Sequence, residues 1–427
     1  MVAGRTMSRV TSPVATPSNS RFAARILAEG SANSRSVVTL VVIGAIAWAG
    51  LVYIGVQLAL AGPPGVGFDL ELLVDAGRKA AAGTGMYSPA LLAGDTVPAQ
   101  SLFYSYPPYV GQAMALIAWL PTPVILVAWA GIATLGLAVV SVRVARGFRP
   151  AIPALAVALP VVVLAPLVLP YAISVLFGNF NMFFAALYGL ILLAALAPEG
   201  DPAPRVVGGV ALGIAAATKI HPASLGLWFL VRGWQERRDG GRPVSWLVLG
   251  AAVGTGMVLV VSSLIVGGVQ PWLDYLAVVR ASSGATLLDH RNYGPAAILG
   301  QAIGFSEAAV RAVHLVVLGL ALAVTAWAAW RRTDTVTSLG IAAVASLVIL
   351  PVTWIHYPAA LIPFVVAALV RGPTSRTRAL AAAAGVAVLL AIAVPPLLWL
   401  GIGLVVIALG SSGTASAQGP RPAATAA

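Results

Sequence analysis

The chain has 427 residues, of which 59% are hydrophobic and only 9% are charged, and its formal net charge is +12. Because soluble globular domains carry about 25% charged residues, this composition excludes a water-soluble fold and predicts an all-α, polytopic integral membrane protein. The basic excess forms short arginine clusters between apolar runs, which is typical of membrane proteins and excludes a nucleic-acid-binding domain, and the absence of cysteine excludes disulfides and thiol catalysis.

Residues 1–36 are rich in Ser, Thr, Pro and Arg and predict a disordered cytoplasmic tail. A transmembrane domain is predicted over residues 37–410, because spanning helices need about 20 mostly apolar residues, and residues 411–427 predict a second disordered cytoplasmic tail. The first span, about 37–61, runs from the inside to the outside. Further apolar runs lie near 104–120, 122–142, 151–170, 181–197, 205–218, 222–233, 244–267, 308–330, 336–350, 356–370, 377–394 and 396–410.

The arginine clusters between these runs predict the topology, because basic loops stay on the cytoplasmic side. If runs 104–120 and 122–142 both crossed the membrane, the arginines within 143–149 would lie outside. We therefore expect one of these two runs not to be a full span, which leaves about 12 spans and both termini inside. Two long polar segments, about 62–103 and 268–307, then lie on the extracytoplasmic side. The same side receives the turns at 171–180, 219–222 and 351–357.

The first external segment predicts an amphipathic helix over residues 69–82, lying at the membrane surface with its charged face in water. Helical steps of about 100° place Glu71 on the charged face, whereas Asp69 points with the apolar face. Asp69 is therefore either the N-cap of this helix or a catalytic carboxylate that faces a cavity.

Aromatic and amide side chains stand at the outer ends of two runs. Tyr104 and Tyr106 belong to FYSYPPY, which is typical of an interfacial aromatic belt, although either ring could also stack on a sugar. Asn179 and Asn181 belong to FGNFN at a helix start. One of them is expected to cap the helix, and the pair could instead hold hydroxyls or a phosphate.

Lys219, in ATKIHP, is one of only two lysines and ends an apolar run on the outer side. It either snorkels to the interface or, as ionisable residues at such positions often do, serves function. We expect it to bind an anion such as a phosphate, with His221 beside it.

Two later segments contain further polar candidates. His290 and Arg291 belong to LLDHRNYGP, which is either a solvated loop or part of an anion site. His356 lies in PVTWIHYP, at a proline-bounded turn, where it is either an interfacial hydrogen-bonding residue or part of the same outer site. With only four histidines, scattered along the chain, neither a metal site nor a cofactor is expected.

The motifs taken in order resemble those of a known family. They are FD with an amphipathic helix and MY (68–87), YPP (106–108), GNFN (178–181) and K-x-x-P (219–222). This arrangement resembles glycosyltransferase family 87, the polyprenyl-phosphate-sugar-dependent enzymes of the GT-C type, over most of residues 37–410. Within that family the chain is most similar to the actinobacterial alpha-1,2-mannosyltransferases that extend phosphatidylinositol mannosides, the PimE type.

The resemblance implies an inverting, metal-independent transfer of mannose from polyprenyl-phosphate mannose to a phosphatidylinositol mannoside or a related lipoglycan, at the outer face of the plasma membrane. The family's essential aspartate falls on Asp69, and Glu71 is kept as a rival base. We expect Lys219, His356 and Arg291 to bind the leaving phosphate. Candidates for acceptor or sugar binding are Glu71, Tyr104, Tyr106, Asn179, Asn181, His221 and His290.

Two alternatives remain open at this point. A polyprenyl-phosphate-arabinose-dependent arabinofuranosyltransferase would keep the same fold and site. A lipid or sugar transporter would place ionisable residues at mid-membrane between internal repeats. We find no clear repeat and no acidic residue in the middle of a predicted span, which favours the enzyme.

Overall fold

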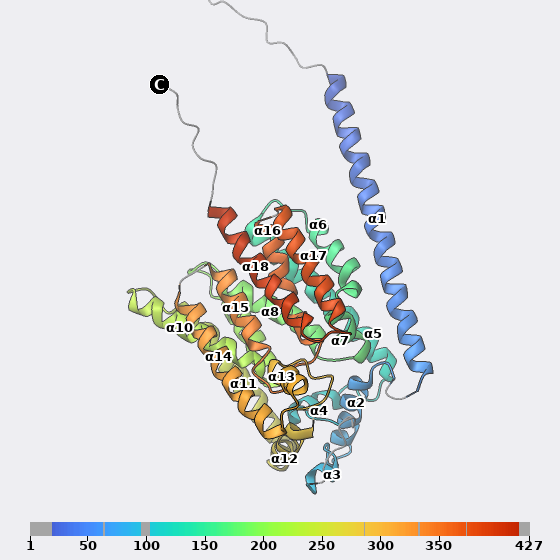
Figure 1. Ribbon diagram of the computed structural model, residues 1–427, viewed down its shortest axis with the longest axis vertical. Coiled ribbons are helices and arrows are strands. Elements are labelled where there is room, and N and C mark those ends of the chain that lie inside the picture. The colour runs from blue at the N-terminus through green and yellow to red at the C-terminus, as the bar shows by residue number, and fades with distance from the viewer. Residues whose placement is uncertain are drawn as a thin grey trace, which may run out of the picture.

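The computed structural model describes residues 19–62, 65–94, 103–285, 287–331, 334–372 and 374–417. All regular secondary structure in these ranges is helical, which confirms the predicted all-α class (Figure 1). In chain order the helices are α1 (Asn19–Leu60), α2 (Phe68–Ala81), α3 (Pro89–Leu92), α4 (Pro108–Ala115), α5 (Thr122–Phe148), α6 (Ala154–Leu164), η1 (Ala165–Leu167), α7 (Leu169–Phe177), α8 (Asn181–Leu196), α9 (Ala203–Thr218), η2 (His221–Ala223), α10 (Ser224–Arg238), α11 (Val244–Gly267), α12 (Gln270–Ala285), α13 (Pro295–Ile303), α14 (Glu307–Trp330), α15 (Thr335–Ser346), η3 (Tyr357–Leu361), α16 (Ile362–Arg371), α17 (Ser375–Leu390) and α18 (Leu397–Ala417).

Several of these helices are suited to cross a membrane, which confirms the predicted polytopic character. Within the described ranges, four are long and apolar enough: α1 from Val37 onward, α5, α11 and α14. Helices α6, η1 and α7 together would form a fifth span, bent by 72°. Shorter apolar helices of 10–17 residues, among them α8 and α9, accompany these. The number of about 12 spans stays a prediction.

The run at 104–120 is the one that does not span. Its helix, α4, has only 8 residues, whereas α5 has 27. Prolines mark the start of both helices. Pro107 precedes α4, Pro108 is its first residue, and Pro121 precedes α5, positions at which a proline is tolerated because the first N–H groups of a helix have no partner within it. Of the two helices, only α5 is long and apolar enough to cross a membrane. The side on which the following arginines lie stays a prediction.

The two termini differ from the prediction. Helix α1 begins at Asn19, so the second half of the predicted tail at 1–36 belongs to a helix rather than to an irregular segment. In Figure 1 this helix projects beyond the rest of the bundle. Helix α18 likewise continues to Ala417, past the predicted limit at 410. Residues 1–18 and 418–427 lie outside the described ranges.

The main hydrophobic core of the bundle lies around α8, α9, α10, α15, α16 and α18. Small side chains let some of the helices approach closely. The Tyr188 hydroxyl and the Ser346 hydroxyl hydrogen-bond at 2.9 Å between α8 and α15. Helix α9 meets α11 through Gly209, where an added Cβ would lie 2.5 Å from the carbonyl oxygen of Val248. Such small-residue contacts are how apolar helices associate where lipid removes the hydrophobic driving force.

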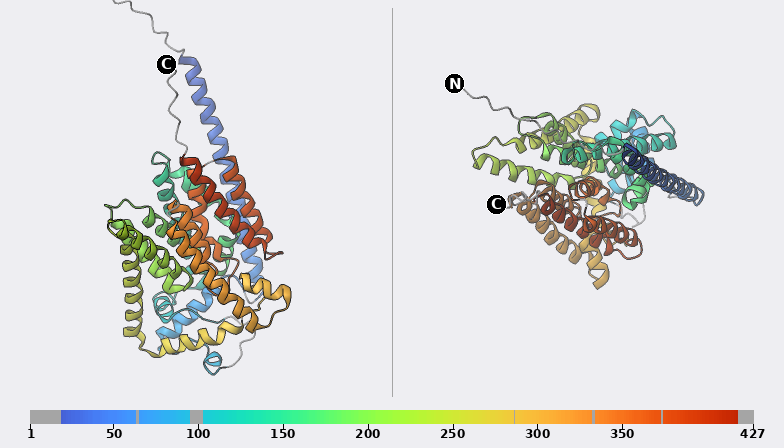
Figure 2. Two further views of the ribbon diagram at one scale, coloured as in Figure 1. Left: turned by 60° about the vertical axis from the view of Figure 1, so that its left-hand side comes forward. Right: turned by 90° about the horizontal axis from the view of Figure 1, so that it is seen from above.

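The short helices α2, α3, α4, α12 and α13 gather at one end of the bundle, away from the beginning of α1 and the end of α18 (Figures 1 and 2). Arg78 on α2 donates from Nε to the carbonyl oxygen of Ala118, at 3.1 Å, just beyond α4. The described parts of the two polar segments predicted outside, 62–103 and 268–307, therefore lie at the same end of the bundle (Figure 1). Which side of the membrane they occupy stays a prediction.

The α9–α11 contact yields a stability prediction. Replacing Gly209 by leucine should lower the free energy of unfolding by about 1–3 kcal/mol, because the new side chain has no space against α11. Gly250→Leu on α11 is the matched control, since an added Cβ there meets nothing within 4 Å. Thermal melting in detergent measures the difference. Equal melting temperatures for the two variants would contradict the close packing.

Candidate functional site

Asp69 lies in the first turn of α2 and faces the interior of the bundle. The predicted N-cap role is wrong, because α2 begins one residue earlier, at Phe68, after Gly67 in a left-handed conformation with φ 75°. The backbone N–H of Gly67 donates to the carbonyl oxygen of Leu176 at 2.7 Å and so holds the start of α2 against the end of α7. The carboxylate oxygen Oδ2 of Asp69 then accepts from Nδ2 of Asn179 at 2.6 Å.

Asn179 connects this carboxylate to a cation. Its carbonyl oxygen Oδ1 accepts from the backbone N–H of Asn181 at 3.0 Å and from Nζ of Lys219 at 3.3 Å. Because a backbone N–H can only donate, the first bond fixes the amide orientation, with the NH₂ toward Asp69 and the oxygen toward Lys219. Asn179 itself is buried. One amide therefore joins three segments that are distant in the sequence.

Lys219 follows α9 directly and points its ammonium between aromatic rings. Nζ lies 4.8 Å from the ring centroid of Tyr357 and 5.8 Å from that of Tyr106, distances at which a cation is attracted to the ring face. This position differs from that of a snorkelling lysine, whose amine would reach for water. The ammonium is instead held next to the Asp69–Asn179 pair.

Burial shifts the pKa of both charged groups. Loss of water around Asp69 raises the pKa of its carboxyl, although the hydrogen bond from Asn179 and the charge of Lys219 lower it in part. Burial lowers the pKa of Lys219 to about 8, while the nearby Asp69 carboxylate opposes this shift. At neutral pH most of the lysine is still protonated. The carboxylate is consequently a stronger base than a solvated one.

Three further buried side chains of this region carry polar atoms without a hydrogen-bond partner among the described residues. These atoms are both ring nitrogens of His221, Nε2 of His356, and both amide atoms of Asn181. Because most buried polar atoms in proteins are paired, such a group indicates a place where a polar ligand or water completes the bonding.

The two histidines are electrically neutral in this environment. Burial lowers the pKa of His221 to about 3 and that of His356 well below its usual value, and the charge of Lys219 adds to both shifts. His221 stacks on the ring of Tyr357, with centroids 5.1 Å apart. His356 can therefore offer a phosphate a hydrogen bond rather than a second positive charge.

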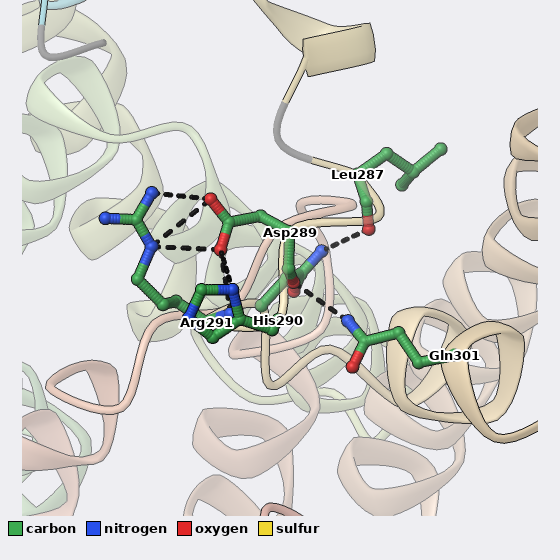
Figure 3. Close-up of polar contacts among 6 residues, drawn as sticks. Leu287, Asp289, His290, Arg291 and Gln301 are labelled. Atoms are coloured by element: carbon green, nitrogen blue, oxygen red, sulfur yellow. Dashed lines mark hydrogen bonds and ion pairs between the residues drawn. The ribbon is translucent and has the colours of Figure 1, made fainter. Parts of the chain in front are cut away.

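The loop at 287–294 is built around Asp289 (Figure 3). The side chain of Arg291 donates to both carboxylate oxygens, from Nε to Oδ1 at 2.9 Å and to Oδ2 at 3.2 Å, and from one terminal nitrogen to Oδ2 at 2.5 Å. His290 is largely exposed, with Nδ1 3.7 Å from Oδ1 of Asp289. Gln301 donates to the Asp289 carbonyl oxygen at 2.8 Å. The structure thus gives Arg291 a carboxylate partner within its own loop.

A residue outside the predicted set, Asn292, fixes this loop to the turn that carries His356. Its Oδ1 accepts from the backbone N–H groups of Gly294 and Thr353, at 2.8 and 3.0 Å. Its Nδ2 donates to the carbonyl oxygens of Leu287 and Pro351, at 3.1 and 3.0 Å. The sequence signal was present in the polar run at 287–295, but the partners some 60 residues away were not readable from it.

The tyrosines and Glu71 take different positions. The Tyr104 hydroxyl donates to the Pro107 carbonyl oxygen at 3.0 Å and accepts from the Gly111 N–H at 2.7 Å, so it shapes the start of α4. Tyr106 is half-buried, beside the Lys219 ammonium. Glu71 is exposed on α2. Tyr106 is thus the tyrosine placed to meet a ligand, and Asp69 rather than Glu71 faces the cation.

In the part of the chain that the structure describes, no three His, Asp or Glu side chains come close enough together to hold a metal ion. The positive charge available next to Asp69 is the ammonium of Lys219.

Comparison with known proteins adds one assignment. The model of glycosyltransferase family 87 matches residues 104–354, a segment that contains Asn179 and Lys219 and begins after Asp69. Among curated proteins there is no significant match. Among solved structures, ArnT from Cupriavidus metallidurans bound to undecaprenyl phosphate is similar at 18% identity, over 90% of this chain and 78% of that chain, with a TM-score of 0.37.

The Asn292 bonds generate a prediction for this region. Replacing Asn292 by alanine should speed hydrogen exchange at the amides of Gly294 and Thr353, because both lose their acceptor and the loop loses two of the hydrogen bonds that hold it to the turn at 351–357. The control is His290→Ala, which removes an exposed side chain from the same loop. Hydrogen-exchange mass spectrometry measures both. Unchanged exchange in the Asn292 variant would contradict its role as the attachment.

Proposed function

This chain belongs to glycosyltransferase family 87, and we propose that it transfers a sugar from a polyprenyl-phosphate carrier to a hydroxyl group of a membrane glycolipid. The observation that carries the proposal is the array of Asp69, Asn179 and Lys219. It holds a desolvated carboxylate and an ammonium on the two ends of one amide. Sugar transfer from a lipid phosphate needs both groups, a base for the acceptor and a cation for the leaving phosphate.

In the proposed reaction the acceptor hydroxyl approaches Asp69 and the donor phosphate approaches Lys219. The hydroxyl oxygen attacks the anomeric carbon, and its proton passes to the Asp69 carboxylate, which acts as general base. The bond between the anomeric carbon and the phosphate oxygen breaks on the opposite face, and the phosphate leaves with the electron pair. Lys219 stabilises the charge that develops on it. The configuration at the anomeric carbon is inverted, and the lysine takes the place that a metal ion holds in other transferases.

The neighbouring unpartnered atoms suit the remaining contacts. Neutral His356 can donate a hydrogen bond to a phosphate oxygen. The amide of Asn181 and the ring nitrogens of His221 can pair with sugar hydroxyls, each offering a donor and an acceptor. The half-buried ring of Tyr106 offers a face for the sugar. Arg291 belongs to this set as a second cation only if the Asp289 pair opens.

The finer assignment concerns the sugar and the acceptor. We propose mannose as the sugar, polyprenyl-phosphate mannose as the donor, and a phosphatidylinositol mannoside as the acceptor, on the extracytoplasmic side of the plasma membrane. The support is the order of FD, YPP, GNFN and K-x-x-P along the chain, together with the gathering of these motifs at one end of the helical bundle.

Transfer by the purified enzyme in detergent tests the proposal. Polyprenyl-phosphate mannose and polyprenyl-phosphate arabinose are offered in parallel with a short phosphatidylinositol mannoside, and the lipid products are weighed by mass spectrometry. We expect a product heavier by one mannose. Arabinose transfer would overturn the choice of sugar, and no transfer from either donor by folded enzyme would overturn the function.

Asp69→Asn should lower the transfer rate by at least about 100-fold, because a general base typically contributes that much or more. Glu71→Gln is the matched control on the same helix and should stay near the wild-type rate. The rates are measured with saturating donor and acceptor. A loss in Glu71→Gln with activity kept in Asp69→Asn would exchange the two roles.

The pKa shifts predict the pH dependence of kcat/KM, which reports on the free enzyme. Activity should fall as the pH rises through about 8, where Lys219 loses its proton, and fall again at low pH, where Asp69 becomes protonated. In Lys219→Arg the basic limb should disappear, because arginine stays charged throughout this range. A basic limb that is unchanged in this variant would show that another group titrates there.

A further inference from the structure

A second site lies where α10, α11 and α14 meet, remote from Asp69. Three tryptophans, Trp234, Trp246 and Trp330, line a pocket of about 440 Å³ together with Leu230 and Val231. We call it the tryptophan pocket. All five lining side chains are apolar or aromatic, and Leu230, Trp234 and Trp330 are each 46% exposed.

Specific contacts among α10, α11 and α14 hold the three tryptophan rings around the pocket. Trp234 and Trp330 stack across α10 and α14 with ring centroids 5.3 Å apart. Gln235 donates to the carbonyl oxygen of Trp330 at 2.7 Å and fixes the two helices to each other. Trp246 donates to the carbonyl oxygen of Leu230 at 3.2 Å, and its ring lies where a Cβ on Gly233 would clash. In an aromatic belt at a membrane interface the rings only need to face outward. Here three helices arrange the three tryptophan rings around one pocket.

Arginines border the pocket. The Arg238 guanidinium lies 5.4 Å from the ring centroid of Trp234 and 5.3 Å from that of Trp330. The Arg237 guanidinium lies 5.8 Å from the ring of Trp246. Stacking on an aromatic ring leaves the edge of a guanidinium available for planar, bidentate contact with a phosphate. Both arginines are exposed.

Two acidic residues lie near the tryptophan pocket, but its arginines outnumber them, so the net charge around the pocket is positive. Glu236 accepts from the backbone N–H and the hydroxyl of Ser245, at 2.9 and 2.6 Å, and so caps the start of α11. Asp239 lies 4.0 Å from Nε of Arg238. Against these two acids stand Arg237, Arg238 and the nearby Arg331, whose guanidinium lies 5.5 Å from the ring of Trp327.

The pocket and the short helices that hold the candidate active site lie at opposite ends of α11 (Figure 1). Helix α11 begins beside Trp246 and has 24 residues, which at 1.5 Å each correspond to about 36 Å. Its far end leads into α12, among the short helices at the site end (Figure 1). Helix α11 is long and apolar enough to cross a membrane, and a helix that crosses has its two ends near opposite lipid headgroups.

We propose that the tryptophan pocket binds an anionic glycerophospholipid, with one acyl chain in the hollow and the phosphate on Arg237 and Arg238. A free phosphate would leave the apolar hollow empty, and a zwitterionic lipid would bring a cation next to the arginines. The combination of an apolar pocket with a basic rim at the headgroup level fits a lipid that has both a chain and a net negative charge.

Lipid titration followed by native mass spectrometry tests the proposal on the full chain in detergent. Phosphatidylglycerol should bind at least about tenfold more tightly than phosphatidylcholine, and glycerol 3-phosphate at the same concentrations should not bind. The double variant Arg237→Gln/Arg238→Gln should lose that preference, a weakening of about tenfold. Arg376→Gln/Arg378→Gln on α17, which removes two other exposed arginines, should keep it.

Several results would overturn the proposal. The first three are equal binding of the two lipids, an equal loss of affinity in both double variants, and binding of glycerol 3-phosphate alone. The fourth is a dimer mass that disappears with Arg237→Gln/Arg238→Gln, because a second copy of the chain would then be the occupant of the pocket. Asp69→Asn should bind phosphatidylglycerol as the wild type does. Lipid binding is thereby judged separately from sugar transfer.

Discussion

The hydrogen bond from the Asn179 amide to the Asp69 carboxylate, continued to Lys219 on the other side of the amide, is the interaction on which the rest of the site depends. Removing two opposite charges from water is costly, and direct pairing would leave each neutralised by the other. An intervening amide satisfies both groups while keeping them apart. The carboxylate therefore stays basic and the ammonium stays available, which a direct ion pair would not allow.

The aromatic residues around this array serve the same end. The ring of Tyr357 meets both the Lys219 ammonium and the neutral ring of His221. Its position depends on the turn at 351–357, and that turn is held by Asn292 from a loop some 60 residues earlier. Two buried amide side chains thus hold the surroundings of the Lys219 ammonium in place. Asn179 acts on the charged groups, and Asn292 acts on the backbone that carries their neighbours.

Sequence reasoning reached the helical class and the amphipathic helix over 69–82, because composition and periodicity are local signals. Arginine placement indicated that one of the runs 104–120 and 122–142 is not a full span, but it did not indicate which one. Sequence reasoning also found that Asp69 points with the apolar face. The N-cap role suggested for Asp69 was wrong. The start of the helix depends on the hydrogen bond from Gly67 to Leu176, a contact between distant residues that a sequence pattern does not reveal. The tryptophan pocket was missed for a similar reason, since its rings come from three helices and each ring alone is typical of a membrane interface.

The three charged and amide groups of the site lie far apart along the chain, and this has a consequence for how the protein is made. About 150 residues separate Asp69 from Lys219, which at 5–20 residues per second corresponds to roughly 8–30 seconds of synthesis. Throughout that interval Asp69 has no Lys219 to face, and for its first 110 residues no Asn179 amide either. The buried surroundings of the carboxylate form only when the segments that carry Asn179 and Lys219 fold against the start of α2. The array of Asp69, Asn179 and Lys219 is therefore complete only in the finished bundle.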